Sequence, residues 1–306
     1  MSACVLYCED EAAAARRLAE AAGLEARPVA RHRFPDDELK LTLPFPAAGP
    51  MPGTLVIYRS LDRPNDKLVE LLLLARHARR AGARRLVLVA PYLAYMRQDA
   101  AFRAGEVVSQ PLVGEFLAEL FDAVITVDPH LHRIDRLEQA IPLSQAIALS
   151  GAPRLGELIA EKRDAPLLIG PDAEALQWVE SAAVATGFAF DVCHKTRHGD
   201  REVAIALPAV EVADRRVVLM DDVASSGYTV ARAAQALLAA GAASVDLAVT
   251  HALFAGDALA VIEAAGVDEV WSTDCIAHPS NAIPMAPVLA TALGHVLSPG
   301  TGQSPQ

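Results

Sequence analysis

Short apolar segments alternate with helix-like segments along almost the whole sequence, and this alternation restricts the fold more than any other feature. Residues 54–60, 84–92 and 123–130 are apolar runs rich in valine and isoleucine. The segment 65–82, between the first two runs, has the length and the apolar spacing of a helix. Strands that alternate with helices are typical of parallel sheets whose faces are covered by helices. The sequence therefore predicts the α/β class, with mostly parallel sheets flanked by helices.

A second series of apolar segments begins after Ala152 and predicts a second domain of the same class. Its expected strands are LLIGPD (167–172), FDVCHK (190–195), EVAIAL (202–207), VVLMDD (217–222), SVDLAVTHALF (244–254) and EVWSTDCI (269–276). We expect an N-terminal domain over 1–148 and a C-terminal domain over 149–285, with the boundary inside 145–152. The helical segment 286–297 is expected to pack back on the first domain, and the polar residues 298–306 to be a disordered tail.

Composition and charge exclude several classes of protein. A chain of 306 residues is long enough for two domains with separate cores. Its net charge of −11 argues against a general nucleic-acid binder. It has no uncharged apolar run of about 18 residues, so we expect no membrane span. The first residues lack the basic start and apolar core of a signal peptide, and we expect a cytoplasmic protein with reduced cysteines.

Residues 217–242 carry the clearest indication of a ligand site. Val217 to Met220 form an expected buried strand, and Asp221 and Asp222 follow at its carboxyl end. A loop of small hydroxyl residues and one glycine, 225–229, then leads into an alanine-rich helix. Ligands bind beyond the carboxyl ends of parallel strands, and a helix N-terminus attracts anions. The segment therefore suits a phosphorylated pentose, although an ordinary strand–turn–helix with a capped helix has the same pattern.

Further polar motifs occur at the expected strand ends and in the adjoining loops. They are FPDDELKLTLP (34–44), PYLAYMRQDAAFRAGE (91–106), VDPH (127–130), IGPD (169–172) and HKTRHGDREVAI (194–205). Alone, each has a structural explanation: a loop cation is usually solvated, and a single histidine is more often hydrogen-bonded than a ligand. Their number and order make the set more specific than any member.

Together with the loop at 225–229, these motifs resemble the ribose-phosphate pyrophosphokinase family, also called phosphoribosyl-diphosphate synthetases. The resemblance extends from about residue 34 to about residue 293. It implies two phosphoribosyltransferase-like domains, with ATP motifs in the first and the ribose 5-phosphate site in the second. It also implies Mg²⁺-dependent transfer of the diphosphoryl group of ATP to the 1-hydroxyl of ribose 5-phosphate, which gives 5-phosphoribosyl 1-diphosphate and AMP.

The resemblance assigns roles by position. Lys195 and Arg197 are implied to be catalytic, on a mobile loop, and His130 and Asp172 to bind Mg²⁺. The implied ATP-binding residues are Phe34, Asp36, Asp37, Glu38, Arg97, Gln98 and Asp99. The implied ribose 5-phosphate residues are Asp221, Asp222, Ser225, Ser226, Gly227, Tyr228 and Thr229. In the family the loop at 34–38 comes from a neighbouring subunit, so a homo-oligomer, a dimer or a hexamer, is implied as well.

Several loop residues depart from the family pattern. Tyr228 and Asp37 stand where glycine is usual, Ser225 replaces a common aspartate, and Glu174 adds charge near the expected path of the diphosphate. These departures leave two alternatives: a regulatory paralogue without catalysis, or a kinase of this fold for another sugar phosphate. Retention of both Asp221 and Asp222 with the cationic residues favours catalysis. If the phosphate loop still binds its anion, Tyr228 should have a negative φ and its ring should point away.

Overall fold

The computed structural model describes residues 3–46, 51–198 and 202–298, with the backbone alone for 195–198 and 202–206. Within these ranges the chain divides into two compact units. Unit 1 contains the residues up to Leu149 together with those from Met285 onward, and unit 2 runs from Ser150 to Pro284. The expected disordered tail, apart from Ser298, lies outside the described residues.

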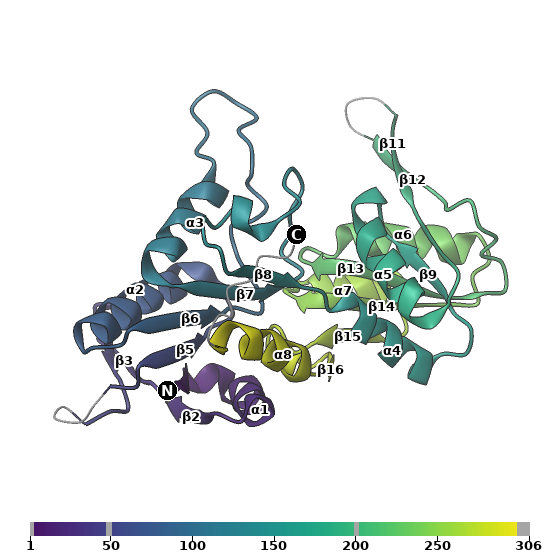
Figure 1. Ribbon diagram of the computed structural model, residues 1–306. Coiled ribbons are helices and arrows are strands. Elements are labelled where there is room, and N and C mark those ends of the chain that lie inside the picture. Colours follow the sequence, from purple (N-terminus) through teal and green to yellow (C-terminus); the bar gives the residue numbers. More distant parts are fainter. Residues whose placement is uncertain (1–2, 47–50, 199–201, 299–306) are drawn as a thin grey trace, which may run out of the picture. The chain divides into compact units, whose positions relative to one another are not determined.

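Unit 1 is built on a six-stranded parallel sheet of order β2-β1-β5-β6-β7-β8. The strands are β1 (Ala3–Tyr7), β2 (Glu25–Pro28), β5 (Thr54–Tyr58), β6 (Arg85–Val89), β7 (Ala123–Val127) and β8 (Ala146–Leu149). Helices cover both faces of the sheet: α2 (Pro64–Arg80) and α3 (Ser109–Leu120) lie on one face, and α1 (Ala12–Ala22) and α8 (Ala286–Leu297) lie on the other (Figure 1). Helices on both faces explain why the central strands β5 and β7 are buried along their whole length.

An antiparallel hairpin of β3 (Ala30–Arg33) and β4 (Leu39–Thr42) projects from unit 1. In β4 the alternate residues Leu39 and Leu41 are partly buried, and the residues between them are exposed. This is the alternation expected from the sequence of 34–44. The turn of the hairpin contains the residues 34–38.

Unit 2 repeats the plan with the parallel order β10-β9-β13-β14-β15-β16. Its strands are β9 (Leu167–Gly170), β10 (Phe190–Val192), β13 (Arg216–Ala224), β14 (Ser244–Ala252), β15 (Val270–Thr273) and β16 (Asn281–Ile283). Helices α4 (Ala152–Lys162) and α5 (Leu176–Thr186) pack on one face, and α6 (Tyr228–Ala239) and α7 (Ala258–Ala264) on the other. A second hairpin pairs β11 (His194–His198) with β12 (Glu202–Ala206).

The expected fold class is confirmed, with two local differences. The segment 190–195 is divided at Cys193 between β10, in the main sheet, and β11, in the hairpin. The strand expected over 217–220 continues to Ala224, because β14 pairs with it as far as Ala252. No helix among the described residues has both the length and the apolar character that a membrane span requires.

Candidate ribose-phosphate site and nucleotide loops

Three carboxylates gather where the strand order of unit 2 reverses. The chain passes from β9 outward to β10, then returns to place β13 on the other side of β9. Ligands of open parallel sheets bind at such a switch point. Asp172 follows β9, and Asp221 and Asp222 lie in the last half of β13. The structure therefore brings the sequence-predicted Asp172 together with the aspartate pair.

The three carboxylates lie close together and are buried or half-buried. Asp222 is 2% exposed, and its backbone N–H donates to Asp221 Oδ1 at 2.9 Å. Asp172 is also buried, and its side chain accepts a hydrogen bond from the Glu174 N–H at 3.0 Å. Burial, followed by repulsion from Asp222 and by a smaller repulsion from Asp172, raises the pKa of Asp221 well above its ordinary value. The site is therefore a concentration of negative charge that a cation or hydroxyl donors would relieve.

The position of the aspartate pair differs from expectation in one respect. The sequence placed Asp221 and Asp222 at the carboxyl end of the strand, whereas β13 continues past both residues to Ala224. Val223 and Ala224 still pair with β14, so the loop begins only at Ser225.

The loop Ser225–Gly227 turns sharply into α6, and Gly227 adopts the left-handed backbone conformation that this turn requires. Gly227 has φ +77°, and a Cβ there would lie 2.8 Å from the carbonyl oxygen of Ala258. Tyr228 is the first residue of α6, is absent from the non-glycine residues with positive φ, and is 56% exposed. Because the turn is made one residue earlier, a side chain at 228 is tolerated. The negative φ expected for Tyr228 is found.

A neighbouring loop supports this turn from β14. The backbone N–H of Phe254 donates to the Ala224 carbonyl, and that of Ala255 donates to the Ser225 carbonyl, both at 2.9 Å. Two main-chain hydrogen bonds thus hold the start of this loop against the segment that follows β14.

Lys195 and Arg197 were expected on a loop, but their backbone belongs to β11. Their side chains lie outside what the structure describes.

In unit 1 the loops after β6 and β7 are joined by an ion pair. Arg97, Gln98 and Asp99 follow β6, and Arg97 and Gln98 are exposed. The Asp99 side chain is only 3% exposed and pairs with Arg133 from the loop after β7. Arg133 also lies 5.6 Å over the ring of Phe102. The sequence reasoning missed Arg133, since only the adjacency of β6 and β7 brings the two loops together.

His130 has an imidazole neighbour that the sequence did not single out. The Nε2 atoms of His130 and His132 are 2.5 Å apart, and their rings meet edge to face at 4.3 Å. Asp128 does not share a strand face with His130, because β7 ends at Val127 and Asp128 has φ +37°. The spacing of alternate residues does not apply past the end of the strand.

The turn 34–38 explains one departure from the family pattern. Asp37 has φ +76°, a conformation that glycine adopts without strain. Its carboxylate accepts a hydrogen bond from Arg33 at 2.7 Å, and its N–H donates to the Phe34 carbonyl at 2.9 Å. Phe34 is 41% exposed, and Asp36 and Glu38 are also exposed. Asp37 is thus paired within the hairpin, and its side chain, like those of Phe34, Asp36 and Glu38, is exposed.

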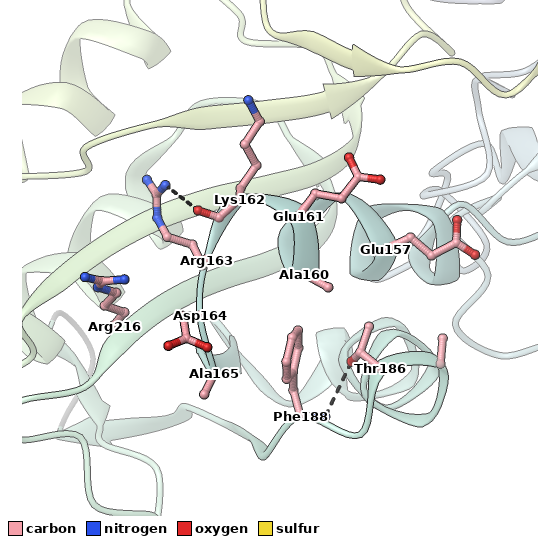
Figure 2. Close-up of a pocket in the computed structure, with 11 residues that line it drawn as sticks. Glu157, Ala160, Glu161, Lys162, Arg163, Asp164, Ala165, Thr186, Phe188 and Arg216 are labelled. Carbon is pink, nitrogen blue, oxygen red and sulfur yellow. Dashed lines mark hydrogen bonds between the residues drawn. The ribbon is translucent and has the colours of Figure 1, made fainter.

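A groove of about 820 Å³ lies at the other end of the unit 2 sheet. Figure 2 shows it between the ends of α4 and α5, with Phe188 on one wall and Arg216, the first residue of β13, at its edge. Arg163 at this groove is already paired with Asp246 at 2.7 Å and Glu269 at 3.0 Å. No sequence-predicted site residue lines the groove, and it is separate from the aspartate pair at the far end of β13.

Comparison with known proteins agrees with this architecture. Residues 3–120 match the model of the N-terminal domain of ribose phosphate pyrophosphokinase, and residues 148–270 match the phosphoribosyl transferase domain. The fold is similar to the crystal structure of phosphoribosylpyrophosphate synthetase from Mycobacterium smegmatis, with a TM-score of 0.81, 21% identity and coverage of 97% of this chain and 99% of that chain. The protein is therefore a tandem pair of phosphoribosyltransferase-type domains.

Sequence relatives define the family more narrowly. The ribose-phosphate pyrophosphokinase of Methanopyrus kandleri is 35% identical over 91% of this chain and 94% of its own. Ribose-phosphate pyrophosphokinase 2 of Archaeoglobus fulgidus is 32% identical over 94% of this chain and 98% of its own. The chain belongs to the ribose-phosphate pyrophosphokinase family.

Proposed function

We propose that this protein transfers the diphosphoryl group of ATP to the 1-hydroxyl of ribose 5-phosphate, releasing AMP. One observation carries the proposal beyond family membership. The aspartate pair of β13 leads directly into the loop closed by Gly227 and the N-terminus of α6, at the switch point of the unit 2 sheet. An acceptor for sugar hydroxyls and a donor for a phosphate thus lie on one continuous segment.

In this proposal the pentose is held at both ends. Asp221 and Asp222 accept hydrogen bonds from ribose hydroxyls, which offsets the repulsion that raises the pKa of Asp221. The 5-phosphate accepts hydrogen bonds from the main-chain N–H groups of 226–229 and from the hydroxyls of Ser225, Ser226 and Thr229. The exposed Tyr228 ring stays outside. Two anchors fix the direction of the 1-hydroxyl, which must meet the β-phosphorus in line.

Mg²⁺ is the proposed metal, and the carboxylates of unit 2 suit it. Mg²⁺ prefers oxygen ligands and is usually held by one or two carboxylates together with substrate phosphates. Asp172, buried beside the aspartate pair, provides such an oxygen donor. His130 would contribute a ring nitrogen, which is a less usual ligand for this ion, near the phosphates of the nucleotide. When bound, the metal offsets the negative charge of the diphosphoryl group.

The nucleotide is proposed to meet cationic and aromatic groups. Arg97 and Gln98 bind ATP from the loop after β6, and Asp99 holds this loop through its ion pair with Arg133. Lys195 and Arg197 stabilise charge on the transferring group. Phe34, Asp36 and Glu38, exposed on the β3–β4 turn, contact the adenine of a neighbouring subunit. Asp37, which pairs with Arg33 of the same hairpin, is proposed to contact the adenine together with them.

Ribose 5-phosphate-dependent formation of AMP from ATP and Mg²⁺ is the expected result for the purified protein. Chromatography of the nucleotides separates AMP, the product of diphosphoryl transfer, from ADP, the product of simple phosphoryl transfer. Omission of the sugar phosphate and chelation of the metal are the controls. Absence of AMP above background with ribose 5-phosphate and other pentose phosphates would refute the proposed activity.

The proposal includes a homo-oligomer, and α2 offers a surface for it. Val69 is 48% exposed and Leu73 is 43% exposed, one helical turn apart on the same face. Arg33 of the hairpin pairs with Asp66 of α2 at 2.8 Å, which joins this face to the turn 34–38. Apolar side chains exposed in neighbouring positions are typical of protein interfaces.

The double variant Val69→Glu, Leu73→Glu should therefore be monomeric and should have a KM for ATP at least about tenfold higher, equivalent to about 1.4 kcal/mol. Light scattering after size exclusion measures the mass, and initial rates give KM. Val184→Glu is the matched control, because Val184 is 80% exposed on α5 of unit 2. An unchanged oligomer in the double variant would place the interface elsewhere.

A further inference from the structure

Unit 1 has a switch point of its own, and charged side chains fill it. The chain passes from β1 outward to β2 and then returns to place β5 on the other side of β1. Asp10 and Glu11 follow β1, and Arg59 and Ser60 follow β5. This is the position at which a parallel sheet usually receives its ligand. In unit 1 the residues of the protein pair with one another there.

Arg59 is the centre of this network. It is 2% exposed, and its Nη1 donates to Glu11 Oε2 at 2.9 Å and to Asp10 Oδ2 at 3.0 Å. Its Nη2 lies 2.6 Å from Glu70 Oε2, on α2. Burial alone would lower the pKa of Arg59, but Glu11, Cys8 and Glu70 raise it above its ordinary value. The guanidinium therefore stays charged and links the ends of β1 and β5 to α2.

The network continues into the β3–β4 hairpin. Arg31 of β3 donates to Glu70 Oε1 at 2.8 Å and lies 3.5 Å from Asp10. Glu70 is 0% exposed, so one buried carboxylate holds both Arg31 and Arg59. Two residues further along β3, Arg33 donates to Asp66 at 2.8 Å.

The spacing of these pairs fits the two elements. Residues 31 and 33 leave a strand on the same side, and residues 66 and 70 lie one turn apart on the same face of a helix. Two parallel ion pairs therefore join the strand to the helix and restrict rotation of the hairpin about its base. The inner pair is anchored further by the buried Arg59, whereas the outer pair is exposed at both ends.

We propose that Arg31 and Glu70 are positioning residues for the nucleotide: through Arg59 they fix the β3–β4 hairpin on unit 1, so that Phe34 and the acidic turn meet the adenine in one orientation. This inference rests on the proposed function for the role of the turn. Neither residue touches the reacting atoms, and the effect is therefore expected in nucleotide affinity.

Arg31→Ala is the informative variant, since the Arg31 side chain is one-third exposed and its loss leaves the central Arg59–Glu70 pair in place. We expect KM for ATP to rise about tenfold, equivalent to about 1.4 kcal/mol. The value of kcat and the KM for ribose 5-phosphate should change less than about twofold. Arg31→Lys should recover most of the ATP affinity, because lysine retains the point charge that faces Glu70.

Arg79→Ala is the control on the same helix, because Arg79 pairs with Asp122 at 2.7 Å, away from the hairpin. Hydrogen exchange gives a second readout that does not need activity. Arg31→Ala should speed amide exchange in residues 30–42 and leave residues 85–89 of β6 unchanged. Unaltered exchange in the hairpin would overturn the inference, and so would an unchanged ATP KM in an active protein. An inactive wild type would refute the proposed function instead.

Discussion

Asp221→Asn is expected to reduce AMP formation by about 100-fold, the scale of loss when a reacting group is displaced by about 1 Å. The same substitution should raise the thermal stability of the ligand-free protein. Asp221 is held among Asp222 and Asp172 in a buried setting that raises its pKa. An ionised Asp221 therefore costs folding free energy, and a neutral amide removes this cost.

The pH dependence follows from the direction of the shift. Because the folded-state pKa of Asp221 lies above its unfolded value, the folded protein holds this proton more tightly. Below the unfolded pKa the carboxyl is protonated in both states and asparagine has no advantage; the advantage grows as the pH rises and is complete above the raised folded pKa. Thermal unfolding at about pH 8 and about pH 4 measures the difference, for which about 1 kcal/mol at pH 8 is expected.

Asp164→Asn is the matched control, since it removes one exposed carboxylate from the same unit. It should change neither activity nor the pH dependence of stability. A variant at Asp221 that is less stable than the wild type at both pH values would show that the carboxylate is satisfied within the folded protein. The site would then not be a strained acceptor for sugar hydroxyls.

Gly227→Ala should disable the phosphate loop. An alanine would have to adopt φ +77°, at a cost of about 1–2 kcal/mol, and its Cβ would lie 2.8 Å from the Ala258 carbonyl oxygen. The backbone must shift to relieve this contact, which moves the N–H groups that are proposed to meet the 5-phosphate. We expect KM for ribose 5-phosphate to rise at least about tenfold, equivalent to about 1.4 kcal/mol.

Tyr228→Gly is the control for Gly227→Ala. The structure places positive φ at 227 and helical backbone at 228, so removal of the tyrosine side chain should leave the ribose 5-phosphate KM within about threefold, or about 0.7 kcal/mol. Initial-rate measurements at saturating ATP give both constants. The opposite ranking, with a large effect at 228 and none at 227, would mean that the turn is made differently when the phosphate binds.

The apolar runs predicted the sheet strands well because burial on both faces removes any need for alternation. Residues 54–60 became β5 and 123–130 began with β7, each ending earlier than expected where polar residues start. At 217–220 the expected strand was too short. Asp221 and Asp222 look like the end of a strand, yet β13 continues because β14 offers hydrogen-bonding partners as far as Ala252. The local sequence of a strand does not indicate how far a neighbouring strand will pair with it.

The site residues show the same limit. The order of motifs was sufficient to select Asp172 and the aspartate pair, and the structure brings these three together in unit 2. Nothing near Asp99 in sequence indicates Arg133, and nothing near Arg31 indicates Glu70, because both contacts depend on how the elements pack. Tyr228 illustrates the converse: the unusual residue was apparent from sequence, but only the structure shows that the positive φ of the turn falls at Gly227.

The division of the chain has a consequence for its synthesis. Unit 2 is one uninterrupted segment, from Ser150 to Pro284, whereas unit 1 needs both ends of the chain. Helix α8, with Leu289 and Leu293 buried, packs on α1 and on β7 and is synthesised after unit 2. A nascent chain can therefore complete unit 2 while unit 1 still exposes the apolar face that α8 will cover. Unit 1 is therefore completed only by a segment that is synthesised after the whole of unit 2.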